Sequence, residues 1–299
     1  MRKIVLALTA SLAMSAMPEG MAQPDPLIQH LSLTEHVPYD TIDGPSCSFE
    51  LDMDYFIEGA SDRVRASMLK FDIERVRDLQ SARSGGSETA RMDMKTERLP
   101  EAAPVLNLGL VNKMVIEKAF GEEYAKEPVF LAAALYRDAV VADYRKAVKG
   151  ILDEYPDSKS VEYSYRIEGD VIDTGNVFVT YRLQKSCYTG GAHPMLELSY
   201  LNFDGNGFLT LEKLFGADRL KVLEKLVFKA LLAKEGVKDA EGLKEKSYFP
   251  DQFTVSEDFY VQGDTMVFVY DPYEIAAYSR GTVELAVPLK DLKRKGLWK

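Results

Sequence analysis

Apolar and polar residues alternate in several short segments of the chain, which is the period of a β-strand with one buried face. The clearest run begins at Cys47 and continues through Phe49 and Leu51 to Ile57. Similar runs recur farther along, separated by turns that contain glycine. Strands are therefore predicted at residues 47–57, 161–167, 177–183, 195–203, 259–261, 266–270 and 283–287. Turns are predicted at 169–175, 204–207 and 263–264.

Other segments place apolar residues three and four positions apart, the period of an amphipathic helix. Proline is favoured in the first turn of a helix, so Pro128 marks the start of one helix. Glycine often follows the last turn, so Gly121 and Gly236 mark the ends of two others. The hydroxyl of Thr210 is placed to cap a short helix. Helices are predicted at residues 61–79, 108–120, 128–155, 211–215 and 220–235, and loops at 81–98 and 237–252.

The mixture of these elements indicates the fold class. Helices and strands alternate irregularly, and neighbouring strands are mostly joined by hairpins. This order is typical of an α+β fold with a mainly antiparallel sheet and packed helices. Residues 23–44 contain Pro24, Pro26 and Pro38 and are expected to be irregular, together with His30 and His36.

The first residues have the features of a secretory signal. Arg2 and Lys3 precede a short apolar run, and Gly20-Met21-Ala22 offers a cleavage site before Gln23. Residues 1–22 are therefore predicted to be a signal peptide, and the protein is expected to be exported, to the periplasm or outside the cell. The run is too short to span a membrane comfortably, and we expect no transmembrane segment after cleavage.

The net charge indicates which classes of molecule the protein can bind, and the cysteine content bears on a possible disulfide. The formal net charge is −10, which repels nucleic acid and favours a basic partner through long-range attraction. The two cysteines, Cys47 and Cys187, lie in a chain expected in an oxidising compartment. They form either a disulfide or two separate thiols, since spacing alone does not fix their proximity.

The segment Tyr188-Thr189-Gly190-Gly191-Ala192-His193-Pro194 is the most specific motif of the chain. Adjacent glycines permit positive φ angles, so the segment is a shaped turn. His193 either ties this turn to the sheet or acts as a general base beside backbone amides. The second role requires Asp204, Asp271 or Glu274 within hydrogen-bond range.

No nucleophile motif, phosphate-binding loop or metal-binding spacing accompanies His193. Asn202-x-Asp204-x-Asn206-Gly207 matches the first half of a calcium loop, but Lys213 stands where a bidentate acid is needed. We therefore expect no metal, no cofactor and no catalytic residue. A second motif, which contains Tyr270, Tyr273 and Glu274, offers tyrosines that suit protein or sugar binding.

The stretch from Tyr188 to Phe215, with its Thr-Gly-Gly-Ala-His and Asn-Phe motifs, resembles the DUF3298 family. The stretch from Phe268 to Gly281, with Tyr-Glu-Ile-Ala, resembles the same family. The upstream part looks like the DUF4163 module that usually precedes it. The resemblance implies a DUF4163-like module at 23–197 and a DUF3298-like module at 198–299.

Related modules form the extracellular part of lysozyme-binding anti-sigma factors and the non-catalytic part of peptidoglycan deacetylases. The resemblance therefore implies an exported, non-catalytic envelope protein that binds lysozyme, another basic protein or peptidoglycan fragments. Binding is expected at Tyr188, Thr189, Gly190, Gly191, His193, Tyr270, Tyr273 and Glu274. The alternative is a hydrolase of cell-wall glycan or peptide with His193 as its base.

Overall fold

The computed structural model describes residues 27–40, 44–57, 63–65, 105–158, 161–173 and 178–298. The predicted signal peptide, the loop at 81–98 and most of the helix at 61–79 lie outside these residues. Inside that helix, residues 63–65 form a strand instead, so the prediction is wrong there. This strand, β3 (Arg63–Arg65), pairs antiparallel with β4 (Val105–Asn107).

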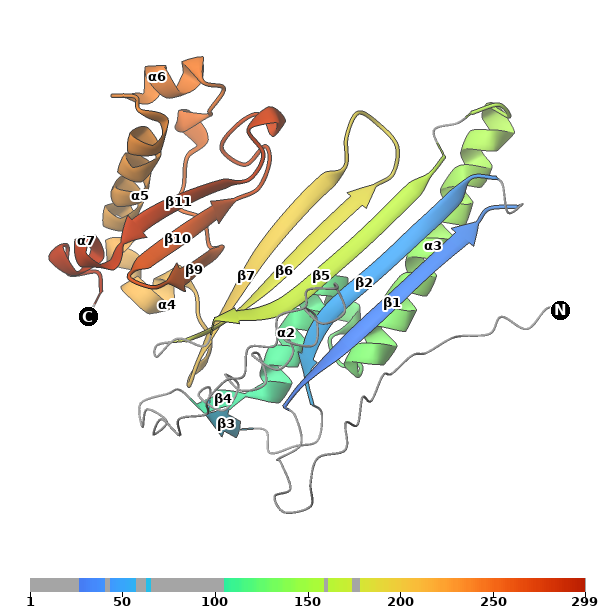
Figure 1. The fold of residues 1–299 in the computed structure, drawn as a ribbon, viewed down its shortest axis with the longest axis horizontal. Helices are drawn as coiled ribbons and strands as arrows, with labels where there is room; N and C mark the ends of the chain where they lie inside the picture. The colour runs from blue at the N-terminus through green and yellow to red at the C-terminus, as the bar shows by residue number, and fades with distance from the viewer. Residues whose placement is uncertain are drawn as a thin grey trace, which may run out of the picture.

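A six-stranded sheet forms the larger part of the described structure, with strand order β1-β2-β5-β6-β7-β8 (Figure 1). All its neighbouring strands are antiparallel except β2 and β5, which run parallel. The strands are β1 (Ile28–Pro38), β2 (Ser46–Phe56), β5 (Tyr163–Asp173), β6 (Val179–Tyr188), β7 (Met195–Asp204) and β8 (Gly207–Phe208). The parallel pair requires a long crossover, and two helices lie within it.

These crossover helices are α2 (Leu108–Phe120) and α3 (Val129–Glu154), with the short helix η1 (Glu122–Tyr124) between them. The side chain of Asn107 caps α2 by accepting a hydrogen bond from the Leu110 amide. Apolar residues of both helices pack on one face of the sheet. The core so formed includes Phe49, Leu51, Met53, Val115, Ala132, Tyr144 and Tyr181.

A second, three-stranded antiparallel sheet has the order β11-β10-β9. Its strands are β9 (Phe259–Gln262), β10 (Thr265–Tyr270) and β11 (Val283–Pro288). Helix α5 (Leu220–Glu235) contacts β11, and the core between the helices and this sheet includes Leu223, Val227, Phe259, Phe268 and Leu285. The remaining helices are α4 (Leu211–Phe215), η2 (Ala217–Arg219), α6 (Ala240–Glu245), η3 (Pro250–Gln252), η4 (Tyr278–Arg280) and α7 (Leu289–Arg294).

The two sheets meet where β9 approaches β7 (Figure 1). The buried side chain of Asn202 joins them: its amide nitrogen donates to the Phe259 carbonyl at 2.8 Å, and its oxygen accepts from the Thr180 hydroxyl at 2.7 Å. The predicted module boundary at 197/198 falls within β7. The division into two modules stays a prediction.

Most predicted elements are present, and the α+β class with mainly antiparallel sheets is confirmed. The irregular segment predicted at 23–44 is wrong, because β1 spans eleven of its residues. The loop predicted at 237–252 contains α6 and η3. Gly169 lies inside β5 rather than in a turn. A Cβ at this glycine would lie 2.3 Å from the Tyr181 hydroxyl oxygen, so glycine leaves room for that ring.

The two cysteines are free, which corrects the disulfide that we considered. Cys47 is buried on β2, and Cys187 is half-buried on β6. Strand β5 lies between them, so two interstrand spacings, about 9.5 Å, separate the two strands. A disulfide tolerates at most about 7 Å between Cα atoms. The alternative of two separate thiols is the one observed.

Candidate functional site

The loop from Tyr188 to Pro194 joins β6 to β7 and is shaped by its two glycines. Gly190 and Gly191 have φ angles of 90° and 109°, a region that favours glycine. The Tyr188 hydroxyl donates to the Gly191 carbonyl at 3.1 Å and closes the turn. Thr189 is exposed. The predicted shaped turn is therefore present.

A second loop joins β10 to β11 and reaches the first from about 80 residues away in sequence. At the start of this loop the Asp271 amide donates a hydrogen bond to the Glu274 carboxylate at 2.9 Å. Tyr273 has a φ of 75°, unusual for a residue with a side chain. Its ring is half exposed, with 51% of its surface accessible. The loop therefore holds a large side chain toward solvent at a constrained backbone position.

His193, Tyr273 and Tyr278 form a connected group across the two loops, called here the aromatic cluster. The His193 ring stacks on the Tyr278 ring with centroids 3.5 Å apart. Its Nδ1 lies 3.1 Å from the Pro194 carbonyl, so Nδ1 carries the proton and donates. Nε2 then accepts from the Tyr273 hydroxyl at 3.1 Å. The Tyr278 hydroxyl donates to the same Pro194 carbonyl at 3.0 Å.

The carboxylates that a catalytic His193 needs are engaged elsewhere. Asp271 accepts from the Leu198 amide, Glu274 accepts from the Asp271 amide, and Asp204 accepts from the Asn206 amide. Both ring nitrogens of His193 bond to a carbonyl or a tyrosine hydroxyl. The described residues thus do not bring an acid, a base and a nucleophile together at His193.

Two carboxylates join the second sheet to β7: Asp258 directly precedes β9, and Asp271 directly follows β10. Asp271 accepts from the Leu198 amide at 3.0 Å, and Asp258 accepts from the Tyr200 amide at 2.7 Å. Burial raises the pKa of Asp271 to about 6, although the bond from Leu198 opposes the rise. Burial likewise raises the pKa of Asp258. We call this pair the carboxylate seam.

A third carboxylate near the seam has the opposite shift. Burial works against the charge of Glu197, but ion pairs with Lys118 at 2.9 Å and Lys185 at 3.6 Å outweigh it and lower its pKa. This network joins α2 to β6 and β7. The seam and the network fix the strand that leads out of the 188–194 loop, and thereby the position of His193.

One predicted binding residue is placed where no ligand reaches it. Tyr270 is fully buried, and its hydroxyl donates to the Thr254 carbonyl at 3.0 Å, so it belongs to the core. Tyr278 was missed as a site residue although it stacks on His193. The only sequence signal for it is its place in the same tyrosine-containing motif as Tyr273, because the contact spans distant segments.

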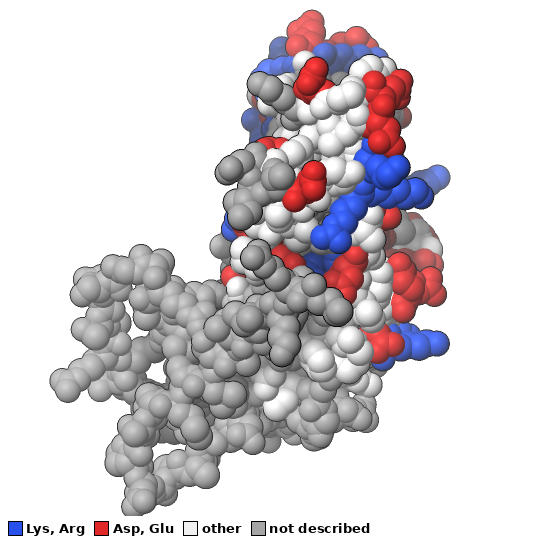
Figure 2. Space-filling model, turned by 90° about the vertical axis from the view of Figure 1, so that its right-hand side faces the viewer, with Lys and Arg blue, Asp and Glu red and all other residues white. Residues whose placement is uncertain are grey.

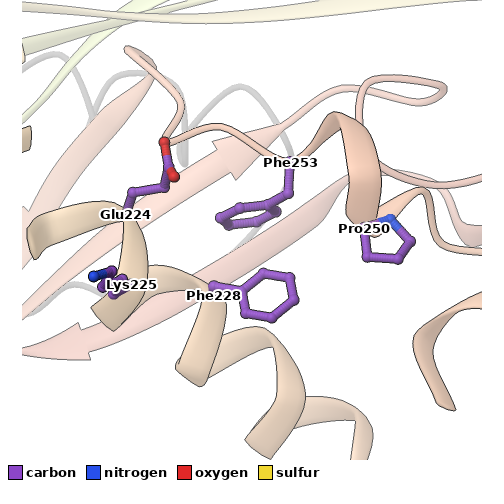
Figure 3. A pocket seen from close by; sticks show the side chains of 5 residues that line it. All are labelled: Glu224, Lys225, Phe228, Pro250 and Phe253. Atoms are coloured by element: carbon purple, nitrogen blue, oxygen red, sulfur yellow. The ribbon is translucent and has the colours of Figure 1, made fainter. Parts of the chain in front are cut away.

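A pocket of about 230 Å³ lies elsewhere, between α5 and the segment around η3 (Figure 3). The rings of Phe228 and Phe253 meet edge to face at 5.1 Å within it. Phe253 also packs on buried Tyr270, which makes this ring pair part of the second core. The remaining lining residues are Glu224, Lys225 and Pro250. None of the predicted site residues lines this pocket.

Comparison with known proteins supports the resemblance seen in the motifs. Residues 212–290 match the family described as "Protein of unknown function (DUF3298)". None of the curated proteins compared with the chain matches it. A crystal structure of a DUF3298 family member from Bacteroides fragilis shares the fold, with a TM-score of 0.68 and 21% identity over 89% of this chain and 91% of that chain.

A second crystal structure, of a DUF3298 family protein from Pseudomonas aeruginosa, covers 90% of this chain and 94% of that chain. Its TM-score is 0.48 and its identity 17%. The upstream DUF4163-like module stays a prediction. Within the described residues, no helix combines the length and the apolar character needed to cross a membrane.

Proposed function

We propose that this chain, whose residues 212–290 match the DUF3298 family, is a non-catalytic binding protein of the cell envelope. Residues 1–22 act as a signal peptide, and the mature protein is periplasmic or secreted. A DUF4163-like module at 23–197 precedes the DUF3298-like region. The ligand is lysozyme or another basic protein, or else peptidoglycan fragments.

The aromatic cluster is the observation that carries this proposal. Tyr273 is 51% exposed, and its hydroxyl is fixed by the bond to His193. A ring that is already held in place loses little side-chain entropy when a ligand covers it. Tyrosine also offers both apolar area and a hydrogen-bonding group, which makes it frequent at energetically important interface positions. The two loops therefore suit recognition of a surface.

The charge of the chain supports a basic protein as that ligand. A net charge of −10 attracts a basic partner over long range and speeds its encounter. Salt screens this attraction, with a Debye length of about 8 Å at physiological ionic strength. Binding of a basic protein should accordingly weaken as salt is added, whereas binding of a neutral sugar should not.

The alternative function, hydrolysis with His193 as base, has weaker support. A general base needs a free nitrogen within reach of the proton that it removes. In His193 one nitrogen donates to Pro194, and the other accepts from Tyr273. Asp204, Asp271 and Glu274 each accept a backbone amide instead of orienting the imidazole.

Calorimetric titration of the protein with lysozyme, and separately with purified peptidoglycan fragments, tests the proposal at low and high salt. Salt-sensitive binding of lysozyme supports recognition of a basic protein, and salt-insensitive binding of fragments supports recognition of glycan. If neither binds at micromolar concentration, the proposal fails. Release of products from peptidoglycan that stops with His193→Ala would establish the hydrolase instead.

A further inference from the structure

The first strand of the large sheet has an open outer edge. β1 is the terminal strand in the order β1-β2-β5-β6-β7-β8, and its register with β2 runs without interruption from Ile28 to Pro38. Among the described residues, no strand pairs with its other side (Figure 1). Natural edge strands of this length are commonly covered, bulged or charged, because unpaired backbone groups attract another strand.

The hydrogen-bond pattern identifies which residues face outward. The Ile57 amide donates to the Leu27 carbonyl, and the Tyr39 amide donates to the Pro45 carbonyl, both at 2.8 Å. In an antiparallel pair, hydrogen-bonded positions recur every second residue. Odd-numbered residues of β1 therefore bond to β2, and even-numbered residues direct their backbone outward. Among these, the residues Ser32, Thr34 and His36 form what we call the open edge.

One side of the open edge is apolar. Leu31 and Leu33 are only partly buried against the core on the helix side of β1. Arg137 of α3 bonds Glu35 of β1 at 3.1 Å, so that flank of the helix lies beside the strand. Phe130 precedes Arg137 by two helical turns and shares this flank, with 58% of its surface exposed. An added strand would meet apolar surface on this side.

The opposite side of the open edge is acidic. Ser32 and Thr34 are short, and their neighbours on β2 are Asp52 and Glu50. These two carboxylate side chains remain 58% and 48% exposed, respectively.

Each of these acids already has one partner, His30 at 3.3 Å for Asp52 and Arg166 at 3.0 Å for Glu50. Short neighbours leave them within reach of a long cationic side chain from the next strand position. Figure 2 shows the molecule from the side on which β1 and α3 lie in Figure 1, where uncharged residues form much of the surface between charged groups.

We infer that the open edge binds an extended segment of a basic partner protein as an added β-strand. Lysine or arginine at every second position of that segment reaches Asp52 and Glu50. The intervening apolar side chains cover Leu31, Leu33 and Phe130. Backbone hydrogen bonds from the open edge supply affinity for the added strand. The alternation of cationic and apolar side chains along that strand supplies specificity for its sequence. A second copy of this chain fits less well, because two chains of net charge −10 repel each other.

This surface lies on β1, at the end of the sheet away from β7, so it does not depend on the aromatic cluster. The test uses the full chain and a fluorescent peptide of alternating lysine and valine, about ten residues long to match the edge strand. One control peptide has the same composition with all lysines in one block. A second is the alternating peptide with N-methyl groups that remove its backbone donors.

Fluorescence anisotropy should show binding of the alternating peptide that weakens with salt. The blocked and N-methylated peptides should bind at least about tenfold more weakly, because they lose the alternation or the backbone bonds. Equal binding of all three peptides would mean attraction by charge alone and would overturn the inference. Absence of binding by the alternating peptide would overturn it as well.

A matched pair of variants tests the edge itself. Thr34→Pro removes an outward amide but no bond to β2, whereas Thr34→Ala keeps that amide. Thr34→Pro should weaken peptide binding about tenfold, and Thr34→Ala should leave it nearly unchanged. Circular dichroism checks that both variants are folded.

If Thr34→Pro does not fold, the combined Glu50→Gln and Asp52→Asn variant replaces it. Its peptide binding should lose most of its salt dependence. Undiminished binding by a folded Thr34→Pro variant would contradict the inference. Sedimentation of the protein as a dimer that Thr34→Pro dissociates would also contradict it, because the edge would then accept a second copy.

Discussion

Replacing Asp271 by asparagine should stabilise the protein at neutral pH and have little effect in acid. The Asp271 carboxylate accepts a bond from the Leu198 amide, and the oxygen of an asparagine side chain can accept the same bond. The substitution therefore removes the charge while keeping the contact between β10 and β7. What it removes is the cost of keeping an ionised group partly buried.

The magnitude follows from the pKa. Burial raises the pKa of Asp271 from 3.8 to about 6. At 1.36 kcal/mol per pH unit, this difference corresponds to about 3 kcal/mol, and residual contact with solvent reduces it to about 1–2 kcal/mol. Because the folded pKa is raised, the folded chain binds the proton more tightly than the unfolded chain. In the wild type, the stabilisation that comes from this bound proton is complete below pH 3.8 and is lost as the pH rises to about 6. Above that pH the wild type is therefore less stable than the variant, which carries no charge at this position.

Urea unfolding of the wild type and of Asp271→Asn, measured from pH 3.5 to 8, gives both free energies of unfolding. We expect the variant to be more stable by about 1–2 kcal/mol above pH 7, with the difference disappearing near pH 4. Glu241→Gln, at an exposed position on α6, controls for the general loss of one negative charge. A difference that does not change with pH, or a destabilised variant at pH 7, would refute this reasoning.

Two further substitutions and one thiol measurement test other parts of the structure. Asn202→Leu should lower the free energy of unfolding by about 2–4 kcal/mol, because it leaves its buried hydrogen-bond partners on β6 and β9 without a bond. Urea titration measures this free energy, and a loss under about 1 kcal/mol would contradict the prediction. Glu235→Gln should destabilise by about 1–3 kcal/mol at pH 7, because the carboxylate bonds Arg280 at 2.6 Å. Burial opposes the charge of Glu235, but its hydrogen bonds and ion pairs outweigh burial and lower its pKa. The difference in free energy of unfolding between the wild type and Glu235→Gln should therefore shrink as the pH falls below about 4.5. A difference that stays constant with pH would contradict this account. Thiol titration of unreduced, unfolded protein should find both Cys47 and Cys187 reactive, and a midpoint of thermal unfolding that falls on addition of a reductant would indicate a bridge.

Local patterns were sufficient for elements with a clear period and a marked boundary. Helix α5 ends before Gly236, which adopts the left-handed conformation, and α4 begins after Thr210, whose hydroxyl accepts from the Lys213 amide. β1 was missed because edge strands are less apolar and prolines surround it. Pro38 is accommodated at the strand end, where its missing amide would point away from β2. The capped helix α6 was missed because it is short and polar.

The site was only partly predictable for a different reason. The glycines of the 188–194 loop require a turn that sequence alone indicates, and His193 was recognised there. Its stacking on Tyr278 arises because the β10–β11 loop is held beside β7 by the carboxylate seam. No local pattern encodes that approach. For the same reason Tyr270 and Tyr273, three residues apart, looked equivalent, although one is buried and the other half exposed.

The most direct test of the proposed function compares lysozyme binding by two tyrosine variants. Tyr273→Ala removes the ring of the aromatic cluster that is 51% accessible, and Tyr155→Ala removes a somewhat more exposed ring, 61% accessible, at the end of α3. We predict that calorimetry will show at least about tenfold weaker binding for Tyr273→Ala and an unchanged affinity for Tyr155→Ala. Equal affinities for both variants and the wild type would contradict the assignment of the binding surface to the aromatic cluster.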